Sequence, residues 1–201
     1  QEMISRYGEE AINKFFKILE TPEESPTAKM LTVMCLTAYV KPEWKERLLP
    51  ITKPGVEVNS RLCALTLLSI IPTEDITDYL KSILNDPEPR VQFVVLTALA
   101  KRNQPEGLQK LNELWDKATR PQEREHILLS IPPNRTKEFL NLYRAGVLDM
   151  EMSNSVRREA IIALGRFGEN QDVAVLKEVL EKDTDFDMKE LAQGAIDAIN
   201  S

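Results

Sequence analysis

Apolar residues repeat along this chain with a period of about 32 residues. One apolar column consists of Leu68, Leu99, Ile131, Leu164 and Ile196. Four residues before each member stands a second column, which consists of Ala64, Val95, Ile127, Ala160 and Ala192. Residues four apart share one face of a helix, so these two columns together predict one amphipathic helix in every unit.

A second pair of columns predicts a second helix in each unit. The first of these columns holds Leu80, Leu111, Tyr143 and Leu176, and the column four residues later holds Leu84, Trp115, Val147 and Leu180. Prolines fall between the helical segments, where a helix cannot continue. The predicted helices are 8–20, 27–40, 43–52, 57–71, 74–86, 89–102, 105–118, 121–131, 135–149, 154–167, 170–182 and 187–200.

Short helices that alternate with this period predict an all-α fold. We expect a right-handed α-α superhelix, that is, a solenoid of about six stacked helical hairpins in a single domain over residues 1–201. A tetratricopeptide array would need a period of about 34 residues and a Trp, Gly and Tyr signature, which the sequence lacks. Armadillo units are longer and contain three helices.

The stretch SNSVRREAIIALGRFGENQDVAVLKEVLEKD, residues 153–183, resembles a HEAT repeat. Its V-R-x-x-A-x-x-A-L-G core is that of the short bacterial repeats named after the phycobilisome lyases. Residues 89–115 match the same pattern, and weaker copies cover most of the chain. The resemblance is specific for architecture only. A phycobilin lyase-like role is one alternative function that it implies.

A basic column follows the first residue of the repeat core and consists of Arg61, Gln92, Arg124, Arg157 and Lys189. Acids end the preceding helices at Asp86, Glu151 and Asp183. An acid that ends one hairpin and a base that opens the next predict a ladder of ion pairs along the stack. An interior anion site is the alternative, but a feature repeated in most units favours the structural ladder.

The GRFG tail at 165–168 does not predict a phosphate loop. Phosphate loops place glycines before a helix, whereas Gly165 and Gly168 follow one. We expect Gly165 to permit close helix packing and Gly168 to adopt the left-handed conformation that ends a helix.

The sequence predicts no catalytic, cofactor-binding or metal-binding residues, and therefore no enzyme and no cofactor. His126 is the single histidine, so multi-histidine metal sites have no second ligand. An ordinary half-exposed helix residue is the expectation for it. Cys35 and Cys63 lie in apolar helical patterns and are expected to be buried free thiols.

Charge argues against nucleic acid as the main partner. The net charge is −6, and residues 1–100 carry 11 bases and 14 acids while residues 101–201 carry 15 bases and 18 acids. Nucleic-acid binding, as in the HEAT-like DNA glycosylases, is kept as an alternative because residues 101–166 carry 12 bases and 9 acids. Trp44 and Trp115 could then stack on bases, although an apolar column holds Trp115.

The longest apolar run, LCALTLLSII, has 10 residues, so no membrane span is expected and the cytoplasm is the expected compartment. The chain begins at Gln1 rather than Met, which leaves an upstream tether as an alternative. The first and last predicted helices are the outer members of a stack. We therefore expect apolar terminal surfaces, which would suggest either a fragment of a longer protein or end-to-end self-association.

The second helices are expected to line a concave face and to present polar side chains along it. The candidate partner-binding residues are Lys81, Asn112, Glu113, Arg144, Lys177 and Glu178. The alternative is an ordinary solvated helix face. The predicted function is a non-catalytic scaffold that binds a partner protein or an extended peptide there, with no small-molecule substrate.

Overall fold

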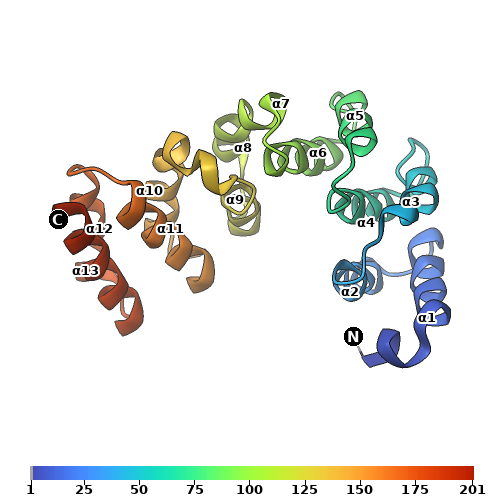
Figure 1. The fold of residues 1–201 in the computed structure, drawn as a ribbon, viewed down its shortest axis with the longest axis horizontal. Coiled ribbons are helices and arrows are strands. Elements are labelled where there is room, and N and C mark those ends of the chain that lie inside the picture. Colours follow the sequence, from blue (N-terminus) through green and yellow to red (C-terminus); the bar gives the residue numbers. More distant parts are fainter. Residues whose placement is uncertain (1) are drawn as a thin grey trace. The chain divides into compact units, whose positions relative to one another are not determined.

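The computed structural model describes residues 2–201, with side chains from Gly8 onward, and it confirms the all-α prediction (Figure 1). Every regular element in the described residues is a helix. The chain divides into two compact units, residues 1–99 and 100–201, near the C-terminal end of one helix. The prediction of a single domain over residues 1–201 stays a prediction.

The first unit contains six α-helices and one short 3-10 helix. Their bounds are α1 Glu2–Glu20, α2 Pro26–Thr37, η1 Pro42–Trp44, α3 Lys45–Ile51, α4 Val58–Leu68, α5 Glu74–Ser82 and α6 Pro89–Lys101. The second unit contains α7 Pro105–Leu108, α8 Leu111–Lys117, α9 Pro121–Leu128, η2 Pro133–Phe139, α10 Leu140–Leu148, α11 Asn154–Phe167, α12 Asp172–Lys182 and α13 Phe186–Asn200.

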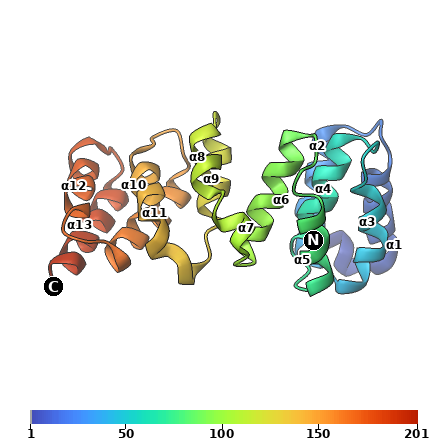
Figure 2. The ribbon, with the colours of Figure 1, turned by 90° about the horizontal axis from the view of Figure 1, so that it is seen from above.

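Two kinds of helix alternate in each unit. We call α2, α4, α6, α9, α11 and α13 the arginine-layer helices, because they carry the basic column, and α1, α3, α5, α8, α10 and α12 the leucine-layer helices. Within a unit, α2 packs on α4 and α11 packs on α13, so like helices lie side by side (Figure 2). The closest pairs along the chain are α1 with α2, α3 with α4, α10 with α11 and α12 with α13. Each hairpin therefore begins with a leucine-layer helix and ends with an arginine-layer helix. The sequence pattern had placed the two helices of each unit in the opposite order.

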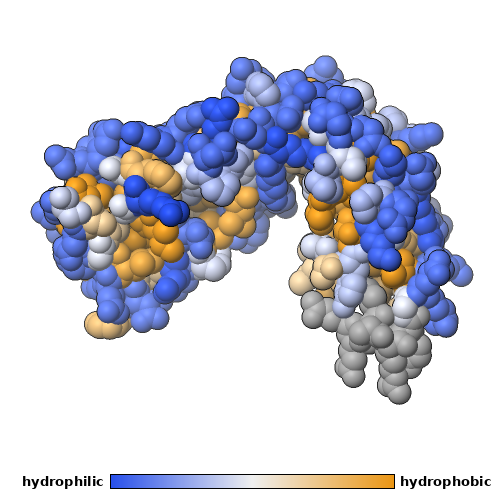
Figure 3. Space-filling model, viewed as in Figure 1, coloured by the Kyte–Doolittle hydropathy of each residue, from blue (hydrophilic) through white to orange (hydrophobic). Residues whose placement is uncertain are grey.

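The apolar columns form the core, as predicted. Leu68, Leu99 and Leu164 are fully buried, and Ile131 and Ile196 are nearly so. Burial of one leucine side chain contributes about 1.5–3 kcal/mol, which makes the repeated columns the main source of stability. Hydrophobic residues that do reach the surface lie next to hydrophilic ones in both units (Figure 3).

Most helix boundaries agree with the predicted ranges, and three segments differ. The predicted helix 154–167 is observed as α11 with the same bounds. The segment 105–118 is split into α7 and α8, and the segments 43–52 and 135–149 begin as the 3-10 helices η1 and η2. Pro133 opens η2 at a position where an N–H group would have no partner within the helix.

The described outward-facing residues of the two terminal helices are mostly polar. Gly165 of α11 packs against α13, and the residue 32 positions later, which would face a following helix, is Asp197. Buried Ile161 has the exposed Gln193 as its counterpart on α13. On α1 the exposed residues are Glu9, Glu10, Asn13, Lys14, Lys17 and Glu20. Phe186 at the start of α13 is nevertheless 77% exposed, and end-to-end self-association stays a prediction.

Candidate functional site

Four basic residues of the arginine-layer helices pair with an acid later in the chain. The pairs are Lys29 with Glu57, Arg61 with Asp86, Arg124 with Asp149, and Arg157 with Asp183. The acid follows its base by 25–28 residues, which is less than one period. We call each base, its acid and the groups that they contact a repeat brace.

Each repeat brace joins three segments. The Nε atom of Arg157 donates to the carbonyl oxygen of Val147 at 3.2 Å, at the end of α10, and its Nη2 atom binds the Asp183 carboxylate. The same carboxylate accepts the N–H of Asp185 at 2.9 Å, just before α13. The equivalent carbonyl acceptors of Lys29, Arg61 and Arg124 are those of Pro22, Thr52 and Ala118. A brace therefore fixes one helix to the hairpin before it and to the turn after it.

The braces support the structural interpretation of the basic column. They exclude an anion site at the most buried brace, which Arg157 and Asp183 form. The Arg157 and Asp183 side chains are each 2% exposed, and the arginine is already satisfied by a carboxylate and a carbonyl. The predicted pairing was wrong in two respects. The base pairs with the acid of its own repeat, and the acid of the third brace is Asp149, because Glu151 is exposed.

The two glycines of the GRFG tail both have close neighbours. A Cβ atom at Gly165 would lie 2.8 Å from the Ala195 Cβ, which confirms close packing of α11 on α13. Gly168 is not left-handed, since its φ is −70°, and that prediction was wrong. It is glycine for lack of room, because a Cβ atom there would lie 2.9 Å from Oδ2 of Asp172 and closer still to the Leu164 carbonyl oxygen.

Gly165→Ala should lower the free energy of unfolding by about 1–2 kcal/mol, since the overlap with the Ala195 backbone outweighs the gain in helix propensity. Gly194→Ala, on α13, is the matched control, because a Cβ atom there meets nothing within 4 Å. It should raise the free energy of unfolding by up to about 1 kcal/mol. Urea unfolding followed by circular dichroism measures both changes. Equal shifts in the same direction would contradict this account.

The structure gives the predicted partner-binding residues different surroundings. Arg144, on α10, binds the carboxylate of Asp172, whose side chain is fully buried at the start of α12. Asp172 also accepts the N–H of Glu169 at 2.7 Å. Burial raises the pKa of Asp172, but Arg144 and the Glu169 N–H outweigh it and hold that pKa below its ordinary range. Arg144 therefore has a structural role that the sequence did not reveal.

The other candidates in the second unit lie nearer the solvent. Asn112, on α8, accepts a 2.9 Å hydrogen bond from Asn141 on α10, so successive leucine-layer helices meet through polar side chains. Glu113 binds Lys110 and Lys117, and Glu178 binds Lys182. Lys177 is exposed on α12. Lys81 is half-buried on α5 in the first unit.

The aromatic and histidine candidates are parts of the packed structure. Trp44 is buried and meets Phe16 edge-on, with ring centres 5.3 Å apart. Trp115 is half-buried, with the Arg124 guanidinium 5.9 Å from its ring centre. Burial therefore closes the Trp44 ring to stacking on a base, whereas the Trp115 ring is partly exposed. His126 is half-buried on α9, as expected, and burial followed by repulsion from Lys101 lowers its pKa to about 4.

The two cysteines are free, as predicted, but they are half-buried and not fully buried, which corrects the prediction. Burial raises the pKa of the Cys63 thiol to about 11, with smaller effects from Lys29 and Glu57. This thiol is therefore uncharged near neutral pH and a poor nucleophile.

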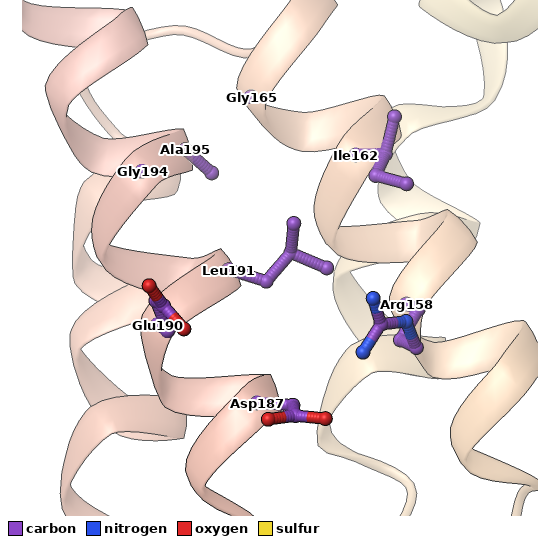
Figure 4. A pocket seen from close by; sticks show the side chains of 8 residues that line it. All are labelled: Arg158, Ile162, Gly165, Asp187, Glu190, Leu191, Gly194 and Ala195. Atoms are coloured by element: carbon purple, nitrogen blue, oxygen red, sulfur yellow. The ribbon is translucent and has the colours of Figure 1, made fainter.

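A groove of about 530 Å³ lies between the neighbouring arginine-layer helices α11 and α13 (Figure 4). Arg158 and Ile162 line it from α11, and Leu191 points into it from α13. Asp187 and Glu190 lie at the same end of the groove as Arg158 (Figure 4). The remaining lining residues are Gly165, Gly194 and Ala195. Arg158 takes no part in the repeat braces and lies at this groove instead.

In the described part of the chain, no group of three or more His, Cys, Asp or Glu side chains is arranged to hold a metal ion. None of the helices described for residues 2–201 is both long and apolar enough to cross a membrane.

Comparison with known families identifies one kind of repeat. A family model of HEAT repeats matches residues 46–131, which run from α3 to the residues that follow α9. No curated protein matches the chain. The match and the all-helical architecture confirm the resemblance to HEAT repeats, while the phycobilisome-lyase type of repeat stays a prediction.

Proposed function

We propose that this HEAT-repeat chain is a non-catalytic scaffold that binds a partner protein, or an extended peptide of one, along its leucine-layer helices. HEAT repeats in general serve as protein-interaction scaffolds. The proposed contact residues are Lys81, Asn112, Glu113, Arg144, Lys177 and Glu178. We also propose that the repeats are of the phycobilisome-lyase type, on the residues of the 153–183 core.

The observation that carries the proposal is the polar continuity of this layer in the second unit. Asn112 of α8 meets Asn141 of α10, and Arg144 of α10 binds Asp172 of α12. Polar side chains that connect successive helices suit an extended ligand, because its main-chain groups need donors and acceptors at regular intervals. Lys177 adds an exposed cation on the last of these helices.

The test is a pulldown with the double variant Lys81→Glu and Lys177→Glu. We expect it to lose a partner that the wild-type chain captures from cells of its own source, as measured by quantitative mass spectrometry. Arg144 is left intact, because its reversal would also break the contact with buried Asp172. The matched control is Lys53→Glu with Lys137→Glu, two exposed lysines, one in each unit and outside the leucine-layer helices.

Three outcomes separate the alternatives. Loss of a protein in the double variant alone supports the scaffold. An unchanged set of captured proteins contradicts it. Capture of nucleic acid, weakening steeply as salt is raised, would favour the nucleic-acid alternative.

A further inference from the structure

We propose that the α11–α13 groove binds a short segment of a partner protein that carries an aliphatic side chain next to a lysine or arginine. This site lies on the arginine-layer helices and goes beyond the proposed function, which uses the leucine-layer helices. The occupant is inferred from the shape of the groove, from its charges and from one glycine.

The walls of the groove suit an aliphatic side chain. Ile162 is 45% exposed on α11, and Leu191 is half-buried on α13 and points toward α11 (Figure 4). Gly165 and Ala195 hold the two helices close together, because their atoms leave no room for a larger residue. An apolar side chain placed between Ile162 and Leu191 would remove surface of both from water, which is favourable.

The charges at one end suit a cation. Asp187 and Glu190 are exposed on α13, and neither carboxylate forms an ion pair with the described residues. Arg158 is exposed across from them on α11 (Figure 4). Two carboxylates and one guanidinium leave this end with a net negative charge, which attracts lysine or arginine and repels phosphate groups. Arg158 remains as a donor for a main-chain carbonyl of the same segment.

Gly194 keeps the groove open at its other end. It lies inside α13, where glycine costs about 1 kcal/mol relative to alanine. Packing does not require this glycine, because a Cβ atom at Gly194 would meet nothing within 4 Å. Gly165, in contrast, is required by Ala195. At Gly194 the surface of α13 carries no side chain, which leaves this end of the groove open.

The experiment is a selection of peptides displayed on phage against the immobilised full chain. A selected peptide, labelled with fluorescein, then serves as the probe, and its Kd is measured by fluorescence anisotropy. We expect the selected peptides to share an aliphatic residue beside a lysine or arginine. Gly194→Leu, which fills the groove, should weaken binding at least about tenfold, and so should Glu190→Lys.

The controls keep folding and binding apart. Gln193→Leu adds the same bulk to the adjacent exposed position of α13 and should leave the Kd unchanged, while circular dichroism verifies that every variant is folded. Three results would each overturn the groove proposal. The selection yields no peptide, the selected peptides lack a basic residue, or Gly194→Leu binds the probe with the wild-type Kd. Loss of peptide binding in Lys177→Glu but not in Gly194→Leu would assign the peptide to the leucine-layer surface and overturn the groove proposal alone.

Discussion

Replacing Arg157 by methionine should lower the free energy of unfolding of the second unit by about 3–5 kcal/mol, because it leaves the buried Asp183 carboxylate without its counter-charge. The change also removes the donor to the Val147 carbonyl. The neighbouring Arg158 is exposed, so Arg158→Met is the matched control and should change the free energy by less than about 0.5 kcal/mol.

The chain holds two tryptophans, Trp44 in the first unit and Trp115 in the second. Urea unfolding followed by fluorescence in a Trp44→Phe background therefore reports the second unit. Adding Asp183→Asn to Arg157→Met should recover part of the loss, since the uncompensated charge disappears. Equal stabilities of Arg157→Met and Arg158→Met would show that the repeat brace does not stabilise the fold.

Acid should destabilise the first unit as the pH falls below about 4.5, and the second unit already as the pH falls below about 6.5. Burial raises the pKa of Glu57, but the Lys29 ammonium and the N–H groups of Asn59 and Ser60 outweigh it and lower that pKa from 4.5 to about 2. The pKa of Asp86 is lowered by Arg61, and that of Asp183 by the Asp185 N–H and Arg157 against the effect of burial.

A carboxylate with a lowered pKa in the folded state stabilises the protein above its unfolded pKa. That stability is lost as the pH falls through the folded value, so Glu57 acts between 4.5 and about 2. His126 acts at higher pH in the same direction, because its folded pKa is about 4 against an ordinary 6.5 and the unfolded chain gains the proton first. Each extra proton bound by the unfolded state costs about 1.4 kcal/mol per pH unit.

Urea unfolding from pH 7 to pH 2.5 measures this loss, with Trp44 fluorescence for the first unit and Trp115 fluorescence for the second. Glu57→Gln should flatten the pH dependence of the first unit below pH 4.5, and His126→Gln should flatten that of the second unit between 6.5 and about 4. A stability that does not change across the whole range would contradict the assigned titrations.

The sequence was sufficient for the helices, because apolar periodicity records which face each helix buries. Leu68, Leu99 and Leu164 were predicted in one column and are fully buried. The order of helix pairing was less accessible, since both kinds of helix have apolar stripes and periodicity does not say which neighbour packs more closely. Only the contacts show that α10 pairs with α11 and α12 with α13.

The basic column was visible in the sequence, but its partners were only partly so. Asp149 and Glu151 are two residues apart, and side-chain length and turn geometry decide that Asp149 meets Arg124. Lys29 was missed, although it lies 32 residues before Arg61, because the N-terminal repeat matches the motif weakly. Arg144 was expected to be available to a partner. Its pairing with Asp172 could not be predicted, because no other repeat shows an arginine and an aspartate at these two positions.

The column of bases has one interruption, and it coincides with the division of the chain. The position of Gln92 is uncharged, and its amide only donates to the main-chain oxygen of Asp86 at 2.7 Å. Ala118 stands near the position where the acid would follow, and the two compact units separate after Leu99, between these residues. Within each unit the braces join neighbouring hairpins, and the one uncharged position of the column lies in α6, the helix within which the chain divides into its two compact units.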